Sequence, residues 1–105
     1  MAEDILTLAR VAAAKRMVFT PHALSQMSRP DRMITTDEVL QVILGGKIIE
    51  DYPADPRGHS CLILGYGKGM RAVHVVCAPK PDFLAIITAY VPDHSQWSPD
   101  FARRI

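Results

Sequence analysis

Two predicted strands carry an imidazole, a hydroxyl and a phenol on one face. The runs 72–77 and 84–90 are rich in β-branched residues and are separated by a proline-containing turn, which is typical of neighbouring antiparallel strands. Folding them across that turn sets His74 opposite Thr88, with Tyr90 two residues further along the same face. Imidazole transfers protons near neutral pH, and a phenol can hydrogen-bond to a substrate or stack on it. The face therefore carries either a site or three polar groups satisfied within the core.

The rest of this face is largely aliphatic, and its two ends differ. In the same register it also holds Leu62, Leu64, Tyr66, Val76, Leu84 and Ile86. The apolar members gather at one end and the polar members at the other, as in a sheet of which half is core and half is a cleft. We expect Tyr66 to contact a substrate there, as Tyr90 would. A structural alternative remains open, in which His74 is buried and bonded to Thr88 or Tyr90.

A second group of polar side chains follows one stripe of a short predicted helix. His22, Gln26 and Arg29 are spaced by four and three residues, so they share a helix face. His22 lies in the first turn, where the helix dipole disfavours imidazolium, so the ring is neutral near pH 7 as a general base requires. Arg29, Arg32 or Arg71 would hold an anionic group, because guanidinium binds phosphate through two parallel hydrogen bonds. The alternative for His22 is a surface histidine beside a capping threonine.

Neither a metal nor an organic cofactor is predicted. The chain has four histidines, but none stands in a recognised ligand pair, and no loop has the spacing of a phosphate-cradling motif. Cys61 and Cys77 fall in two strand-like runs and would face each other in one register of the intervening turn. A disulfide and two free thiols are both open, and we expect free thiols in a chain without an export signal.

The apolar spacing changes from helical to strand-like near Gly45-Gly46. It predicts helices over 3–16, from Thr20-Pro21 to a stop before Pro30, and over 37–44, then strands over 47–52, 60–66, 71–78 and 83–91. Thr35 and Glu38 form a capping box for the third helix. Trp97 and Phe101, four residues apart, suggest a helical turn that covers the sheet. The sequence thus predicts one α+β domain over 1–105, with N-terminal helices followed by a four-stranded antiparallel sheet.

Composition limits the classes of function. A chain of 105 residues with 49% hydrophobic content suits a single domain. Its net charge of +1 weighs against strong non-specific binding of nucleic acid, which usually needs a large positive balance. No apolar run approaches the ~20 residues that span a bilayer, so we expect no membrane association. The first residues are acidic where a secretory signal would be basic, which favours a cytoplasmic protein.

Several segments together are similar to one protein family. They are Phe19-Thr20-Pro21-His22-Ala23, Arg32-Met33-Ile34-Thr35, Asp51-Tyr52-Pro53, His74-Val75-Val76 and Ile87-Thr88-Ala89-Tyr90. From about residue 19 to residue 97 the chain resembles a bacterial family of domains of unknown function, number 4258. That family looks related to the RelE/BrnT-like toxins, in which helices precede a curved antiparallel sheet and which frequently cleave RNA without a metal.

The resemblance implies a metal-independent endoribonuclease, the toxin of a toxin–antitoxin pair, with RNA and a small antitoxin-like protein as partners. Its catalytic residues would be His22, His74 and Tyr90, and its substrate-binding residues would be Arg29, Arg32, Thr88 and Tyr66. The alternative is a non-catalytic module on the same fold, which binds a partner protein through the sheet face or an open edge. The low net charge favours this second interpretation.

Overall fold

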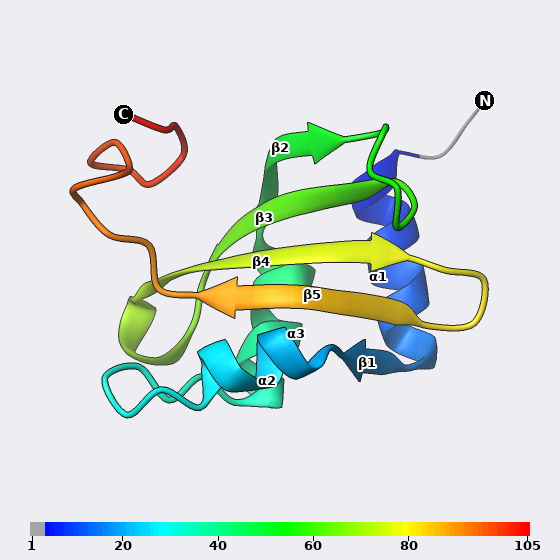
Figure 1. Ribbon diagram of the computed structural model, residues 1–105, viewed down its shortest axis with the longest axis horizontal. Coiled ribbons are helices and arrows are strands. Elements are labelled where there is room, and N and C mark those ends of the chain that lie inside the picture. Colours follow the sequence, from blue (N-terminus) through cyan, green and yellow to red (C-terminus); the bar gives the residue numbers. More distant parts are fainter. Residues whose placement is uncertain (1–3) are drawn as a thin grey trace.

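Within residues 4–105, which the computed structural model describes, three helices and five strands form an α+β structure (Figure 1). The helices are α1 (Ile5–Lys15), α2 (Pro21–Met27) and α3 (Thr36–Gly45), with a short 3-10 turn, η1 (Lys68–Met70). The strands are β1 (Met17–Phe19), β2 (Lys47–Tyr52), β3 (Ser60–Tyr66), β4 (Ala72–Pro79) and β5 (Leu84–Tyr90). The predicted start of the first helix at Glu3 lies outside the described residues. None of the helices in this part of the chain is long and apolar enough to cross a membrane.

The sheet is mixed and five-stranded, in the order β1-β5-β4-β3-β2. The four predicted strands are present, and each pairs antiparallel with the next. The prediction of a four-stranded antiparallel sheet is wrong in one respect, because β1 adds a parallel edge strand that pairs Met17 with Leu84. With three residues, β1 is too short for an alternating pattern to stand out between two helices.

A β-bulge in β5 changes which side chains share a face. The pairs across β5 and β4 are Tyr90 with His74, Thr88 with Val76 and Ile86 with Cys77. Ile87 is therefore an extra residue without a partner in β4. The predicted pairing of His74 with Thr88 is wrong, and Leu84 and Ile86 belong to the helix-covered core instead of the His74 face. A slip of one residue exchanges the two faces of a strand, which is why the bulge moves both side chains.

The two faces of the sheet are covered by different parts of the chain. The core under α1 and α3 contains alternate residues of β3 and β4, namely Cys61, Ile63, Val73, Val75 and Cys77. The opposite face contains Leu62, Leu64 and His74, and all three are buried. Residues 93–105, which we call the C-terminal segment, lie over part of this face, with Trp97 packed edge-on against the His74 ring. Both faces of the sheet are therefore covered, at least in part.

The C-terminal segment is irregular. The backbone of Phe101 is left-handed, with a φ of 60°, and Trp97 forms an isolated antiparallel bridge with Arg104. The predicted helical turn from Trp97 to Phe101 is therefore wrong, although both residues contact the His74 side chain. A left-handed residue four positions after the tryptophan interrupts helical geometry.

The two cysteines are direct neighbours across β3 and β4, as one register of the turn predicts. Their sulfur atoms lie 3.9 Å apart, and both thiols are buried and free. The hydrogen bond with Cys61, together with burial, raises the pKa of the Cys77 thiol. An un-ionised buried thiol is unreactive, so Cys77 acts as a core residue, and Cys61 packs beside it in the same core.

Candidate functional site

A polar cleft opens where α2, the connection from α2 to α3 and the end of β5 meet the C-terminal segment. Its volume is about 500 Å³, and it is lined by Gln26, Arg29, Asp31, Arg32, Tyr90, Val91, Asp93, Gln96 and Trp97. We call it the arginine cleft. It brings together three of the predicted site residues, Arg29, Arg32 and Tyr90.

Thr20 and Pro21 determine where α2 begins and how it is attached to the sheet. Thr20 caps the helix by accepting a hydrogen bond from the Ala23 amide at 3.0 Å, and Pro21 occupies the first helical position, as predicted. The Thr20 hydroxyl donates to the Ile87 carbonyl at 2.8 Å, and the Thr20 amide donates to the Ile86 carbonyl at 3.0 Å. These bonds fix the start of α2 to the edge of β5. The helix then runs beside β5, which places its polar stripe near Tyr90.

The two arginines of the cleft both lie near the carboxylate of Asp31, which does not satisfy all of their hydrogen-bond donors. The Nε atoms of Arg29 and Arg32 lie 3.5 Å and 3.9 Å from Asp31. The Arg32 side chain is 15% exposed, and its buried Nε has no hydrogen-bond partner among the described residues. A buried donor without a partner costs free energy, so an anionic oxygen that reached Arg32 would be held strongly.

Arg71 positions the loop that carries Arg32. Its guanidinium donates from Nε and Nη2 to the two carboxylate oxygens of Glu38, at 2.8 Å and 2.7 Å, and from Nη1 to the Arg32 carbonyl at 2.7 Å. The bonds with Arg71 hold the pKa of Glu38 below its usual value. Arg71 therefore positions the loop of Arg32, and its predicted use as an anion ligand stays a prediction.

Glu38 is a site residue that sequence reasoning placed wrongly. The Thr35 half of the predicted capping box is present, since the Thr35 hydroxyl accepts from the Glu38 amide at 3.2 Å. The Glu38 carboxylate turns inward instead of back to Thr35, and it also accepts from the Lys68 amide at 2.9 Å. The signal that could have indicated this is the position of Glu38 beside buried Val39 in a helix of mostly apolar residues.

His74 joins Tyr90 to the C-terminal segment. Its Nε2 is 2.8 Å from the Phe101 carbonyl, which can only accept, so Nε2 carries the proton. In the neutral ring Nδ1 then accepts from the Tyr90 hydroxyl at 3.2 Å. Burial lowers the pKa of His74 and raises that of Tyr90, so both stay neutral. This arrangement matches the structural alternative, in which His74 is buried and bonded to Tyr90, because both ring nitrogens make hydrogen bonds inside the protein.

The remaining predicted site residues are not in the arginine cleft. His22 is exposed in the first turn of α2, one turn before Gln26 where the cleft lining begins. Thr88 is half-buried on the His74 face, opposite Val76. Tyr66 is 48% exposed and lines a different cleft of about 270 Å³, which shares no lining residue with the arginine cleft. The structure therefore brings together part of the predicted set.

A second polar cleft adjoins the first. Its volume is about 380 Å³, and it is lined by Asp31, Arg32, Arg71, Val91, Pro92, Asp93 and His94. We call it the histidine cleft, since His94 is exposed and its ring lies 4.5 Å from that of Phe101. The sequence interpretation assigned no role to Asp93, His94 or Gln96. The polar run after Pro92 is the signal that could have indicated them.

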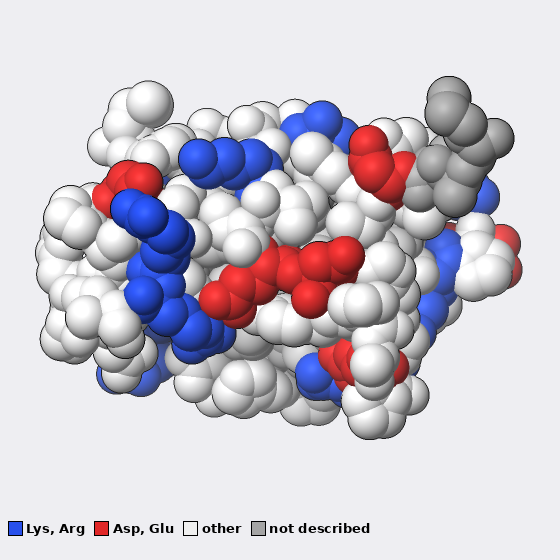
Figure 2. Space-filling model, turned by 90° about the horizontal axis from the view of Figure 1, so that it is seen from above, with Lys and Arg blue, Asp and Glu red and all other residues white. Residues whose placement is uncertain are grey.

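Charge is mixed on the face of the molecule that Figure 2 shows. Seen from above, acidic side chains form a central group flanked by basic ones, so neither sign covers this face (Figure 2). An ion pair between Glu50 and Arg104, 2.8 Å long, joins β2 to the C-terminal segment. Within residues 4–105, His, Cys, Asp and Glu side chains form no group of three that could hold a metal ion.

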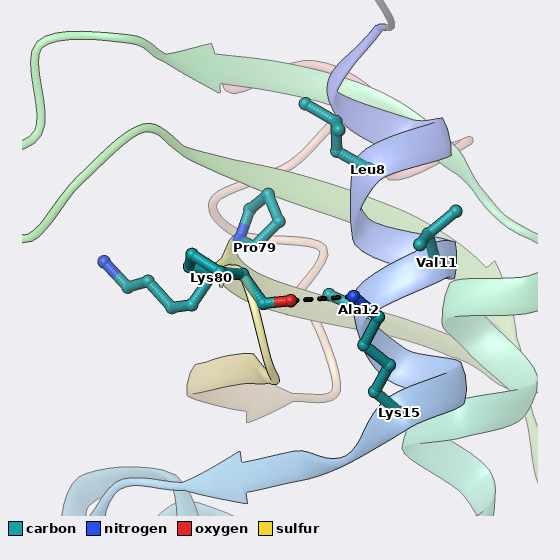
Figure 3. A pocket seen from close by; sticks show the side chains of 7 residues that line it. Leu8, Val11, Ala12, Lys15, Pro79 and Lys80 are labelled. Atoms are coloured by element: carbon teal, nitrogen blue, oxygen red, sulfur yellow. Dashed lines mark hydrogen bonds between the residues drawn. The ribbon is translucent and has the colours of Figure 1, made fainter.

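An apolar groove lies on the far side of the sheet, between α1 and the turn from β4 to β5. Its volume is about 340 Å³, and its lining includes Leu8, Val11, Pro79 and Pro81. Lys15 crosses one end, where its ammonium group donates to the Pro81 carbonyl at 2.8 Å (Figure 3). Leu8 and Val11 are 38% and 50% exposed, so this groove presents apolar surface to solvent.

Comparison with known families assigns the chain. The family model described as "domain of unknown function (DUF4258)" matches residues 19–91, more than half of the sequence. The chain belongs to the DUF4258 family. The DUF4258 region extends from β1 to the end of β5 and includes Arg29, Arg32 and Tyr90, whereas α1 and the C-terminal segment lie outside it. No curated protein and no solved structure matches the chain.

Proposed function

We propose that this DUF4258 protein is a metal-independent endoribonuclease of the RelE/BrnT-like toxin kind. The observation that carries the proposal is the arginine cleft, in which two guanidinium groups and a phenol converge. RNA cleavage of this type uses the ribose 2′-hydroxyl as the nucleophile, so the protein must supply a cation for the phosphate and groups that move protons. The order of elements, helices followed by antiparallel strands, supports the relation to these toxins.

The proposal assigns the roles as follows. Arg32 binds a phosphate oxygen through its guanidinium, whose Nε has no hydrogen-bond partner among the described residues, and Arg29 adds a second, more exposed guanidinium. Tyr90 stays protonated and can redirect its hydrogen bond from His74 to the substrate. His22 is the solvent-exposed histidine of α2 that can exchange a proton with a bound strand.

Two predicted site residues act indirectly in this proposal. His74 has no free ring nitrogen, so it positions Tyr90. Thr88 lies two residues before Tyr90 in β5 and supports that part of the strand. Tyr66 would contact RNA only outside the arginine cleft, because it lines a separate cleft.

Cleavage of a single-stranded RNA by the purified protein in the presence of EDTA tests the proposal. We expect products with 2′,3′-cyclic phosphate ends, and no cleavage of the 2′-deoxy strand of the same sequence. Arg32→Gln should lower kcat/KM by about a hundredfold or more, because the phosphate loses its buried cation. Arg103→Gln is the matched control, since Arg103 is exposed outside both polar clefts. Intact RNA at high protein concentration, in a sample free of any bound partner, would contradict the proposal.

A second candidate is a non-catalytic module that binds a small acidic helical protein. The observation that favours it is the groove of Figure 3, whose lining includes exposed Leu8 and Val11 together with Lys15 and Lys80. Apolar side chains on a partner helix would fill the groove, and its carboxylates would pair with the lysines. Intact RNA together with a stoichiometric acidic partner, lost in Leu8→Glu but kept in Arg32→Gln, would select this candidate.

A further inference from the structure

We infer that the arginine cleft and the histidine cleft together bind one phosphodiester step of single-stranded RNA, with its phosphate at Arg32 and one nucleoside on either side. The inference rests on the proposed function, because it names the substrate of the same site. The observation behind it is that both clefts are lined by the same four residues, Asp31, Arg32, Val91 and Asp93. Arg32 thus lies in a wall between two spaces, and its buried Nε has no hydrogen-bond partner among the described residues.

The charges beside Arg32 limit the ligand to a single phosphate. Asp31 lies 3.9 Å from the Arg32 Nε, and Asp93 lines both clefts. Bonds from the backbone and hydroxyl of Ser95 lower the pKa of Asp93, so this carboxylate stays ionised. A second phosphate directly attached to the first would face a carboxylate and be repelled. Ribose hydroxyls and exocyclic amines are donors, so the nucleosides flanking a phosphodiester suit these acceptors.

Each cleft offers different contacts to a nucleoside. In the arginine cleft the amides of Gln26 and Gln96 and the phenol of Tyr90 can hydrogen-bond to a base edge. In the histidine cleft the exposed His94 ring is supported by Phe101, at 4.5 Å between ring centres, and offers a face on which a base can stack. The base must be unpaired to use either contact, which is why the strand is single.

Binding of three adenine ligands separates this inference from simple charge attraction. The probes are an adenine dinucleoside monophosphate with a 2′-deoxy sugar on its 5′ side, which the proposed reaction cannot cleave, and AMP and ADP. We expect the dinucleotide to bind about fivefold or more tighter than AMP, because it fills both clefts, although it carries the lowest charge. ADP should bind no tighter than AMP. Affinity that rises with ligand charge, measured by calorimetry, overturns the inference.

Matched variants locate the two contacts. His94→Ala should reduce the dinucleotide's affinity to that of AMP, whereas His59→Ala, at an exposed histidine paired with Asp51, should change nothing. Arg32→Gln should weaken dinucleotide and AMP alike, and Arg103→Gln should weaken neither. In the unchanged protein, the His94 ring protons should shift upfield when the dinucleotide binds, which does not depend on how the variants fold. Equal effects of the two histidine variants, or no shift, overturn the inference.

Failure of this inference differs from failure of the proposed function. If the dinucleotide binds tightly with the expected variant pattern but RNA is not cleaved, the two-cleft binding site is supported and the ribonuclease activity is contradicted. If RNA cleavage requires Arg32 but the dinucleotide binds no tighter than AMP, the ribonuclease activity is supported and the two-cleft site is contradicted.

Discussion

At the scale of single residues, Glu38 supports the arginine cleft from behind. Its carboxylate fixes Arg71, and Arg71 in turn holds the backbone of Arg32. Glu38→Gln removes the charge from a buried ion pair, so we expect the free energy of unfolding at pH 7 to fall by about 2–4 kcal/mol. RNA affinity should fall with it, because the loop of Arg32 is released. Urea unfolding measures the first effect.

The pH dependence of the same variant gives a second readout. Arg71 lowers the pKa of Glu38 below 4.5, so the pair contributes its full stability above that pH and loses it as the pH falls through the lowered value. The stability difference between the two proteins should therefore shrink in acid. Asp37→Asn, one residue earlier on the exposed side of α3, is the control and should cost about 0.5 kcal/mol. If Glu38→Gln also lowers the free energy of unfolding by only about 0.5 kcal/mol, the ion pair of Glu38 and Arg71 does not stabilise the fold.

The sequence predicted the residue types of the cleft better than their partners. The predicted helix placed Gln26 and Arg29 on one face, and both line the cleft, although α2 ends at Met27 before Arg29. The bond from Arg71 to Glu38 could not be predicted, because the two residues are 33 positions apart and meet only when η1 folds against α3. His74 and Tyr90 were expected on one face, but their direct contact depends on a bulge that side-chain alternation does not reveal.

At the scale of elements, one hydroxyl joins α2 to the sheet. The Thr20 side chain caps the helix and also donates to Ile87, the bulge residue of β5. Thr20→Val removes both bonds with little change in volume, so we expect a loss of about 2 kcal/mol. Thr20→Ser keeps both bonds and should retain most of the stability. Thr35→Val removes only a cap bond and should cost about half as much, as measured by thermal unfolding.

The long elements were predictable because each repeats a clear pattern. The strands of 47–52 and 60–66 were predicted with the observed bounds, and α3 differs from its prediction by one residue at each end. β1 and the bulge escaped prediction for a common reason. β1 forms by pairing with β5, and the bulge arises where β5 pairs with β4. Both depend on tertiary contacts, which the local sequence of so few residues does not reveal.

At the scale of the whole molecule, the C-terminal segment closes the sheet face and completes the arginine cleft. Three contacts hold it: His74 donates to the Phe101 carbonyl, Trp97 packs on the His74 ring, and Arg104 pairs with Glu50 and lies over Trp97 at 4.6 Å. Two of these involve His74. Since Gln96 and Trp97 line the cleft, its shape depends on the neutral form of one buried histidine.

Acid should therefore release this segment through His74. Burial lowers the pKa of His74 below 6.5, so the unfolded chain binds the proton more readily than the folded chain. Its contribution is fully present above pH 6.5 and is lost as the pH falls toward the lowered value, with a slope of at most about 1.4 kcal/mol per pH unit. Of the charged groups that face the ring, Glu50 favours and Arg104 opposes the imidazolium, and Glu50 itself titrates below this range.

The substitution His74→Gln separates this titration from that of the other histidines. A glutamine amide can still donate to the Phe101 carbonyl but cannot bind a proton in this range. Between pH 7.5 and 5.5 we expect the protection factors for hydrogen exchange at residues 97–104, which correct for the slower intrinsic exchange in acid, to fall in the unchanged protein and to stay level in His74→Gln. His59→Gln should behave as the unchanged protein, because His59 is exposed and lies outside the segment's contacts. If His74→Gln keeps the full acid response, the segment is held by Arg104 and Trp97 alone, and the cleft does not depend on the charge of His74.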